Sequence, residues 1–485
     1  MKNDLRTALN NAVGVCMLAF FSSATGLHAK VVPATLYSDN MVIQQKQQEL
    51  PVWGKAKAGK TVKITPSWDS RSYSVKADKD GKWRTTIRTA AAGGPYSIIF
   101  DDGEKTEIQN VMLGEVWLCS GQSNMEMPMK GFPGQPLEQE ANMDIMCSSN
   151  TKIRLFNVEN SSAILPAEDV KGKWGNANPE TVRDFSATAY YFGRLLQATL
   201  GVPVGLITAD WGGSTIEAWM SAHMLADFPE VALPVAETDI IKKNQTPTTL
   251  YNGMISPIKG FGMQGMIWYQ GESNNSNPQK YEKLFGCFIT SLRKEWEIGE
   301  FPFYFCQIAP YAHYGEDNSA YLREAQFIVD SRISNTGMAV LLDAGMRGCI
   351  HPSKKRVAGE RLALQALTNT YGMTGAAGQS PVYKDMVVSN DTVMLTFDRA
   401  PMGLTSYYKT MRLFTVSGED QKFYPAKAWI KNNQVYLVSD KVKQPVAARY
   451  AFENFVEGEL FGVEGLPVSS FRTDHFINTK PDSSK

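Results

Sequence analysis

Residues 114–125 read Gly114-Glu115-Val116-Trp117-Leu118-Cys119-Ser120-Gly121-Gln122-Ser123-Asn124-Met125, and the rest of the chain is arranged around this stretch. The apolar run 116–119 is typical of a buried strand, and it stops abruptly at Ser-Gly-Gln-Ser-Asn. A serine at the carboxyl end of such a strand lies in the crevice where open α/β sheets bind their ligands. Ser123 is therefore the candidate nucleophile, and the alternative is an ordinary Ser-Gly turn. A nucleophile also requires a base and an oxyanion hole.

The composition indicates a well-packed globular protein of two or three domains. The chain has 485 residues, of which 43% are hydrophobic, and its 10 Trp, 19 Tyr and 23 Phe are enough to line a core and also contact flat sugar rings. Lys plus Arg equals Asp plus Glu at 49 each. Without a net positive field, neither nucleic acid nor an anionic membrane is expected as a partner.

The first 29 residues resemble a secretory signal. Lys2 and Arg6 provide the charged start, residues 12–21 the apolar core, and Ala29 a small residue at the cleavage site. The apolar run is too short to anchor the chain in a bilayer. We therefore expect export to the periplasm or the extracellular space, with no membrane contact after cleavage. The five cysteines that remain have no metal-binding spacing, so no metal is expected.

Three regions follow the signal. Residues 30–110 have strand character, with a hairpin signal at Asp80-Gly81 between residues 71–77 and 82–88, and predict a small β-sandwich. Residues 111–377 alternate strands with helices, which predicts an α/β fold with a parallel sheet and crossover helices, the catalytic domain. Residues 378–485 predict a second small β domain.

Three further predicted strands of the α/β region end in polar or glycine-rich sequence, as the strand before Ser123 does. They are residues 204–208, followed by Trp211-Gly212-Gly213; residues 265–269, followed by Gln270-Gly271-Glu272-Ser273-Asn274; and residues 337–342, followed by Asp343 and, after a loop, His351. Because the carboxyl ends of parallel strands meet at one edge, these groups are expected to lie near Ser123.

A base and an oxyanion hole can be chosen from these strand ends. Of His223, His313, His351 and His475, only His351 lies between the last strand and the final helix of the α/β region, so it is the candidate base. The N–H groups of Ser123 and Gly213 and the side-chain amide of Asn274 are the candidate oxyanion donors, each able to lower the barrier by about 3 kcal/mol.

Several of these motifs together resemble the SGNH, or GDSL-like, hydrolases, and in particular the sialate O-acetylesterase branch. The stretches that carry the resemblance are Gly114-Glu-Val-Trp117, Gly121-Gln-Ser-Asn-Met125, Trp211-Gly-Gly-Ser-Thr-Ile-Glu-Ala-Trp219, Leu250-Tyr-Asn-Gly-Met254, Ile267-Trp-Tyr-Gln-Gly-Glu-Ser-Asn274, Ile350-His-Pro352 and Gly465-Leu-Pro-Val-Ser-Ser-Phe-Arg-Thr-Asp474. They span nearly the whole chain after residue 29.

The resemblance implies a three-layer α/β/α SGNH fold flanked by the two β domains. It also implies a serine esterase that removes O-acetyl groups from sialic acids, such as 9-O-acetyl sialate, through an acetyl-serine and without a cofactor or metal. Gln122, Gln270 and Trp211 are the candidate residues for contact with the sugar.

One departure from the family pattern concerns the acid of the triad. SGNH members carry an acid three residues before the histidine, where this chain has Gly348. Ser123 and His351 then act as a dyad, or a carboxylate arrives from elsewhere. Asp343 is one candidate, at its strand end. Glu272 is the other, because this chain resembles related acetyl esterases with a Gln-Gly-Glu block, which use that glutamate to orient the histidine.

Two alternatives remain open at the level of the sequence. The same motifs serve esterases of acetylated xylan or other polysaccharides. A carbohydrate-binding protein on a decayed hydrolase fold would also explain the missing acid, although the intact Ser123, Asn274 and His351 count against decay.

Overall fold

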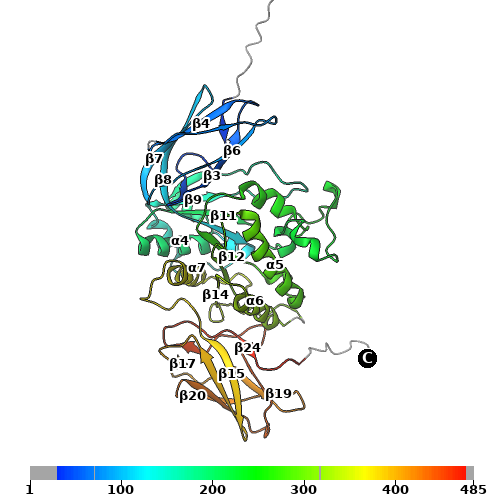
Figure 1. Ribbon diagram of the computed structural model, residues 1–485. Helices are drawn as coiled ribbons and strands as arrows, with labels where there is room; N and C mark the ends of the chain where they lie inside the picture. Colours follow the sequence, from blue (N-terminus) through cyan, green and yellow to red (C-terminus); the bar gives the residue numbers. More distant parts are fainter. Residues whose placement is uncertain (1–29, 70, 316–317, 477–485) are drawn as a thin grey trace, which may run out of the picture.

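The computed structural model describes residues 30–69, 71–315 and 318–476 (Figure 1). The predicted signal, residues 1–29, lies outside the described residues. The fold is mixed α/β, with one large mixed sheet and further, smaller β-sheets. No helix in the described part of the chain is both long and apolar enough to cross a membrane.

The N-terminal region is formed by short strands in two sheets. Its strands are β1 (Val32–Pro33), β2 (Val42–Gln44), β3 (Leu50–Lys55), β4 (Thr61–Pro66), β5 (Tyr73–Lys76), β6 (Lys82–Ile87) and β7 (Gly93–Asp101). The predicted hairpin at Asp80-Gly81 is wrong, because β5 pairs with β4 while β6 pairs with β3. The turn itself is present, with Gly81 at φ 76° and the Asp78 carboxylate accepting from Lys82 N, but it joins strands of two different sheets.

Strand β8 (Lys105–Gly121) connects this region to the central sheet. Its first part runs antiparallel to β7, and its second part runs parallel to β11 (Val204–Asp210) and β12 (Gly265–Tyr269). The predicted domain border at residue 110 falls inside this strand. Residues from Val111 onward are almost all buried, as expected for a strand that is covered on both faces.

The central sheet has the order β10-β9-β11-β8-β12-β13-β14. The strands not yet given are β9 (Asn150–Asn157), β10 (Trp174–Ala177), β13 (Phe303–Cys306) and β14 (Thr336–Ala339). Pairings from β9 through β14 are parallel, and only the edge strand β10 is antiparallel. The parallel sheet predicted from the alternating pattern is therefore confirmed.

Helices cover both faces of this sheet (Figure 1). Trp117 and Cys119 of β8 belong to the core beneath α4 (Ala187–Leu200) and α7 (Lys355–Gln365). The alternate residues Val116 and Leu118 belong to the core on the side of α5 (Pro278–Trp296) and α6 (Ala320–Arg332). This alternation follows from the period of two in a strand. Three shorter helices are α1 (Ser123–Glu126), α2 (Ala141–Met146) and α3 (Pro179–Arg183).

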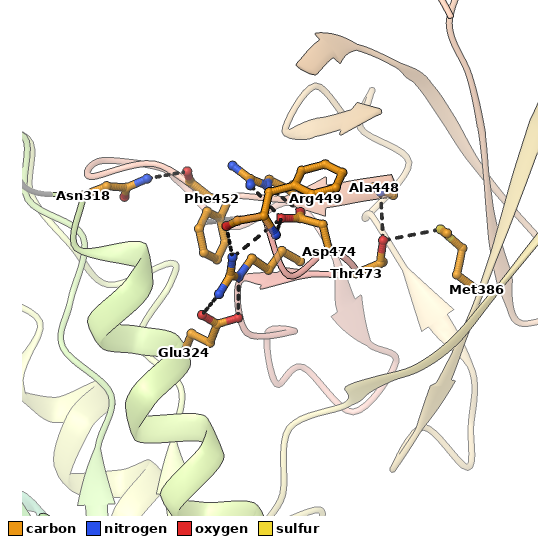
Figure 2. A network of polar contacts seen from close by, with 10 residues as sticks. Asn318, Glu324, Met386, Ala448, Arg449, Phe452, Thr473 and Asp474 are labelled. Atoms are coloured by element: carbon orange, nitrogen blue, oxygen red, sulfur yellow. Dashed lines mark hydrogen bonds and ion pairs between the residues drawn. The ribbon is translucent and has the colours of Figure 1, made fainter. Parts of the chain in front are cut away.

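The C-terminal region is all β and packs on α6. Its strands are β15 (Val382–Ser389), β16 (Thr392–Asp398), β17 (Leu404–Thr405), β18 (Phe414–Ser417), β19 (Phe423–Pro425), β20 (Lys427–Lys431), β21 (Gln434–Val438), β22 (Ala447–Tyr450), β23 (Phe461–Gly462) and β24 (Phe471–Arg472). Figure 2 shows the junction, where Asn318 donates to the carbonyl of Phe452 and Glu324 of α6 faces the C-terminal region. Glu324 accepts two hydrogen bonds from Arg472.

Candidate active site

Ser123 lies at the sharp turn between β8 and α1. Gly121 has φ 146°, and a Cβ at that position would lie 2.2 Å from the carbonyl oxygen of Tyr269, so only glycine fits. Ser123 then becomes the first residue of α1, where its N–H has no acceptor within the helix. Its exposed fraction is only 9%.

His351 meets Ser123 across 228 residues of sequence. His351 Nε2 is 2.8 Å from Ser123 Oγ, and His351 Nδ1 is 2.8 Å from the side-chain carbonyl oxygen of Gln135. Because that oxygen only accepts, Nδ1 carries the proton and Nε2 presents its lone pair to the serine hydroxyl. This is the tautomer that a general base requires.

The imidazole of His351 is neutral over most of the pH range. Burial and, to a smaller extent, the nearby Lys355 ammonium together lower the pKa of His351 to about 4. The base is therefore available to accept a proton at neutral and at mildly acidic pH.

The structure does not place Asp343 against His351. Both carboxylate oxygens of Asp343 accept from the guanidinium of Arg361 in α7, at 2.6 and 2.7 Å. This ion pair joins the end of the last strand to the helix behind it. Nothing in the spacing of these residues along the chain distinguishes Arg361 from His351 as the partner of this carboxylate.

Glu272 lies near the catalytic pair but does not bind the imidazole. It is 7% exposed, and its Oε1 accepts from Asn124 Nδ2 at 2.5 Å. Burial raises the pKa of Glu272, although the Asn124 hydrogen bond and the Lys355 charge oppose that shift. Its contact is thus with the residue that follows Ser123.

A buried network holds the main chain on both sides of His351. Asn124 Nδ2 donates to Ile350 O at 3.1 Å, and Lys355 Nζ donates to Pro352 O at 2.7 Å. Lys355 Nζ also donates to Asn124 Oδ1 at 2.6 Å, which joins the two halves. Burial lowers the pKa of Lys355 to about 8, against the opposing charge of Glu272. We call Glu272, Asn124 and Lys355 the histidine clamp.

The glycine turn predicted to supply an oxyanion donor lies beside Ser123. A Cβ on Gly212 would come within 3.3 Å of the Ser123 Cβ, so this turn approaches the serine as closely as glycine permits. Gly212 N already donates to Glu126 Oε2 at 2.7 Å. Gly213 has φ +69°, and its own carbonyl accepts from Gln245 Nε2 at 2.9 Å, which fixes the turn.

Asn274 is held at both ends of its amide. Its Oδ1 accepts from Gln270 Nε2 at 2.8 Å and from Ile216 N at 3.0 Å, and its Nδ2 donates to Glu217 Oε2 at 2.9 Å. An amide nitrogen has two hydrogens, so one N–H of Asn274 remains for a ligand.

The three residues expected to contact the sugar have different surroundings. Gln122 and Gln270 are 3% and 0% exposed, and both tie loops together: Gln122 Oε1 accepts from Ser273 N, and Gln270 Nε2 donates to Ser214 O. Burial at the strand ends requires such partners, which leaves these amides inside the protein. Trp211 is half-buried against the core beside the glycine turn.

Sequence reasoning missed Gln135 and Lys355. Gln135 lies in the irregular segment between α1 and α2, where no periodicity marks a residue as functional. Lys355 is the first residue of α7, and a lysine there is normally expected to be exposed. Its position four residues after His351 was the only available signal.

Three comparisons with known proteins agree on the class of enzyme. The family model described as carbohydrate esterase, sialic acid-specific acetylesterase matches residues 113–344. Sialate O-acetylesterase of Rattus norvegicus is 27% identical over 456 residues, which cover 80% of this chain and 83% of the rat protein. The Homo sapiens sialate O-acetylesterase is 28% identical over 464 residues, covering 86% and 87% of the two chains.

The structural comparison extends over nearly all of the molecule. The crystal structure of a carbohydrate acetylesterase from Xanthomonas citri superposes with a TM-score of 0.83 at 34% sequence identity, and it covers 92% of this chain and 100% of that one. The expected resemblance to the sialate O-acetylesterases is thereby confirmed. The chain belongs to the carbohydrate acetylesterases, and it is a carboxylic ester hydrolase acting on O-acetylated sugars.

Proposed function

We propose that this protein is an exported serine esterase of the SGNH type that removes O-acetyl groups from sialic acids through an acetyl-serine intermediate. The observation that carries the mechanism is the 2.8 Å contact between Ser123 Oγ and His351 Nε2 at the carboxyl edge of a parallel sheet. Helices on both faces of that sheet support the three-layer SGNH arrangement. The named activity of the rat and human relatives supports the substrate.

Acylation would begin with proton transfer from Ser123 to His351. As Ser123 Oγ attacks the acetyl carbonyl carbon, His351 Nε2 takes the hydroxyl proton. The tetrahedral intermediate then expels the sugar oxygen, to which His351 returns the proton. The acetyl group remains on Ser123, and the deacetylated sugar leaves.

Deacylation repeats the same steps with water. His351 removes a proton from the water that attacks the acetyl-serine, and it returns that proton to Ser123 Oγ when the ester bond breaks. Acetate is released and the site is restored. In both halves the negative oxygen would be held by the N–H groups of Ser123 and Gly213 and by the second N–H of Asn274.

The proposed export rests on residues 1–29, whose charged start, short apolar core and final Ala29 are typical of a cleaved signal. Cell fractionation with and without these residues tests it. The protein should reach the periplasm or the medium only when they are present.

A polysaccharide acetyl esterase is the second candidate function. The observation that favours it is the similarity to the Xanthomonas citri protein, which is 34% identical to this chain. That protein is a carbohydrate acetylesterase, a class that is not restricted to sialic acids. A decayed sugar-binding protein is a weaker alternative, because Ser123 Oγ and His351 Nε2 are hydrogen bonded as a serine nucleophile and its base require.

Acetate release by the purified protein from 9-O-acetyl sialic acid and from acetylated xylan tests these alternatives, with Ser123→Ala as the control. Serine-dependent turnover of the sialic acid supports the leading proposal. Turnover of xylan alone keeps the mechanism and changes the substrate. No serine-dependent release from either compound, nor from an aryl acetate, would refute the proposed catalysis.

A further inference from the structure

One segment covers the outer side of the His351 ring. It runs from residue 127 to residue 140, between α1 and α2, and it contributes two contacts. The Phe132 ring lies edge-on to the imidazole, with centroids 5.2 Å apart and an interplanar angle of 70°. Gln135 Oε1 lies 2.8 Å from His351 Nδ1. Both residues are half-buried, so the segment shields the imidazole from water.

The position that Gln135 occupies is the one where a catalytic triad places its acid. An orienting acid accepts the Nδ1 proton of the histidine and stabilises the imidazolium that forms during catalysis. Here the acceptor is an uncharged amide oxygen. The Cys349 thiol lies beside this oxygen, at 3.7 Å, and closer to the carbonyl oxygen of His351, at 3.2 Å.

The charged groups around the imidazole do not take over the missing role. Lys355 of α7 is cationic and disfavours an imidazolium. Glu272 is separated from the ring by Asn124, and Glu138 of the covering segment accepts from Arg356 N. Among the described residues, the hydrogen bond of Nδ1 is made to Gln135.

We propose that Gln135 is the positioning residue of His351, a neutral amide in the place of the acid of the triad. The inference rests on the proposed serine mechanism and adds to it the third member of the site. Gln135 selects the Nδ1–H tautomer and fixes the ring plane. It leaves the charge of the imidazolium unbalanced, so the base is weak but stays neutral at low pH.

The key variants are Gln135→Glu and Gln135→Leu, with Gln139→Glu as the matched control on an exposed position of the same segment. A carboxylate at position 135 would stabilise the imidazolium, so Gln135→Glu should move the acid limb of the pH profile of kcat/KM upward by about one unit or more. Gln135→Leu should lower kcat by about 100-fold with little change in KM, because the ring loses its orientation. Gln139→Glu should change neither quantity.

A second readout does not depend on activity. In protein with ¹⁵N-labelled histidine, NMR spectra assigned with His351→Gln should show the Nδ1–H tautomer in the wild type, a loss of that preference in Gln135→Leu, and a raised pKa in Gln135→Glu. The proposal is overturned if Gln135→Leu keeps the Nδ1–H tautomer of His351 and a kcat within twofold of wild type. It is also overturned if Gln135→Glu changes neither the acid limb of the kcat/KM profile nor the pKa of His351 measured by NMR. A wild type without serine-dependent activity would refute the proposed function, while the NMR result would still test the role of Gln135.

Discussion

At the scale of single residues, the site depends on a histidine that is kept neutral. His351 is half-buried and lies near the buried ammonium of Lys355, and both effects disfavour its charged form. The site is in this respect unlike a triad with an ionised acid, which favours the imidazolium. The consequence can be observed in the pH dependence of activity and of stability.

We predict that the acid limb of the kcat/KM profile lies well below pH 6.5, because burial lowers the pKa of His351 to about 4. A profile measured on an aryl acetate from pH 3 to pH 8 checks this. The free energy of unfolding should also fall as the pH is lowered. The unfolded chain protonates His351 at a higher pH than the native protein, so this residue's contribution to stability is lost as pH falls from about 6.5 towards 4. A limb at or above pH 6.5 in the wild type would contradict the assigned environment.

Glu272 provides a second prediction at this scale. Its carboxylate contacts Asn124 and not the imidazole, so it anchors the histidine clamp. Glu272→Gln keeps an acceptor for Asn124 and should lower kcat by about tenfold or less, whereas Glu272→Leu removes it and should cost more. An orienting acid behaves differently, since its amide variant loses about 10⁴ in kcat. A loss of that size in Glu272→Gln would show that the carboxylate orients His351 directly.

At the scale of elements, the important unit is the loop that carries His351 between β14 and α7. Its two carbonyls beside the histidine are held by Asn124 and Lys355, which come from α1 and α7. The loop is therefore fixed to the helix that begins with Ser123. This connection fixes the position of the base, His351, relative to the nucleophile, Ser123.

Lys355→Met should lower both activity and stability. The substitution preserves most of the side-chain volume but leaves Pro352 O and Asn124 Oδ1 without their donor, at a cost of about 1–3 kcal/mol for each buried acceptor. Urea unfolding and kcat measure the two effects. Lys354→Met is the control, because Lys354 is an exposed neighbour whose ammonium donates to Asp343 O. Equal kcat and equal unfolding free energy of the two variants would show that Lys355 does not hold the His351 loop.

The elements also show what the sequence could and could not predict. The apolar run before Ser123 and the polar ends of three other strands predicted a parallel sheet and the meeting of Ser123 with His351, because strand ends converge by geometry. The hairpin at Asp80-Gly81 was wrong, since a turn signal does not say which sheet the next strand joins. Gln135 was beyond prediction, because its irregular segment is placed by tertiary packing alone.

At the scale of the whole molecule, the parts are joined by shared structure. Strand β8 belongs both to the N-terminal β region and to the central sheet. The C-terminal region is attached through α6, where the fully buried Arg323 donates to Ala451 O, Glu453 O and Ser470 Oγ. Burial lowers the pKa of this guanidinium to about 10, so it stays charged at neutral pH.

Arg323→Leu should destabilise the junction strongly. It leaves the carbonyls of Ala451 and Glu453 unpaired inside the protein, which should lower the free energy of unfolding by about 3 kcal/mol or more. Arg332→Leu, on an exposed position of the same helix, should cost less than about 1 kcal/mol. Denaturant unfolding and limited proteolysis near residue 378 measure the difference. Equal stability of the two variants would mean that Arg323 does not hold the C-terminal region.

Trapping the acyl-enzyme tests the central assignment of Ser123 as nucleophile most directly. The protein is mixed with an excess of an aryl acetate or an O-acetylated sugar, quenched in acid within the first turnovers, digested and examined by mass spectrometry. One acetyl group should be found on Ser123, in the peptide that contains residues 121–126, and it should be absent in Ser123→Ala. Serine-independent acetate release, or an acetyl group on a different residue, would contradict the assignment of Ser123 as the nucleophile and His351 as its base.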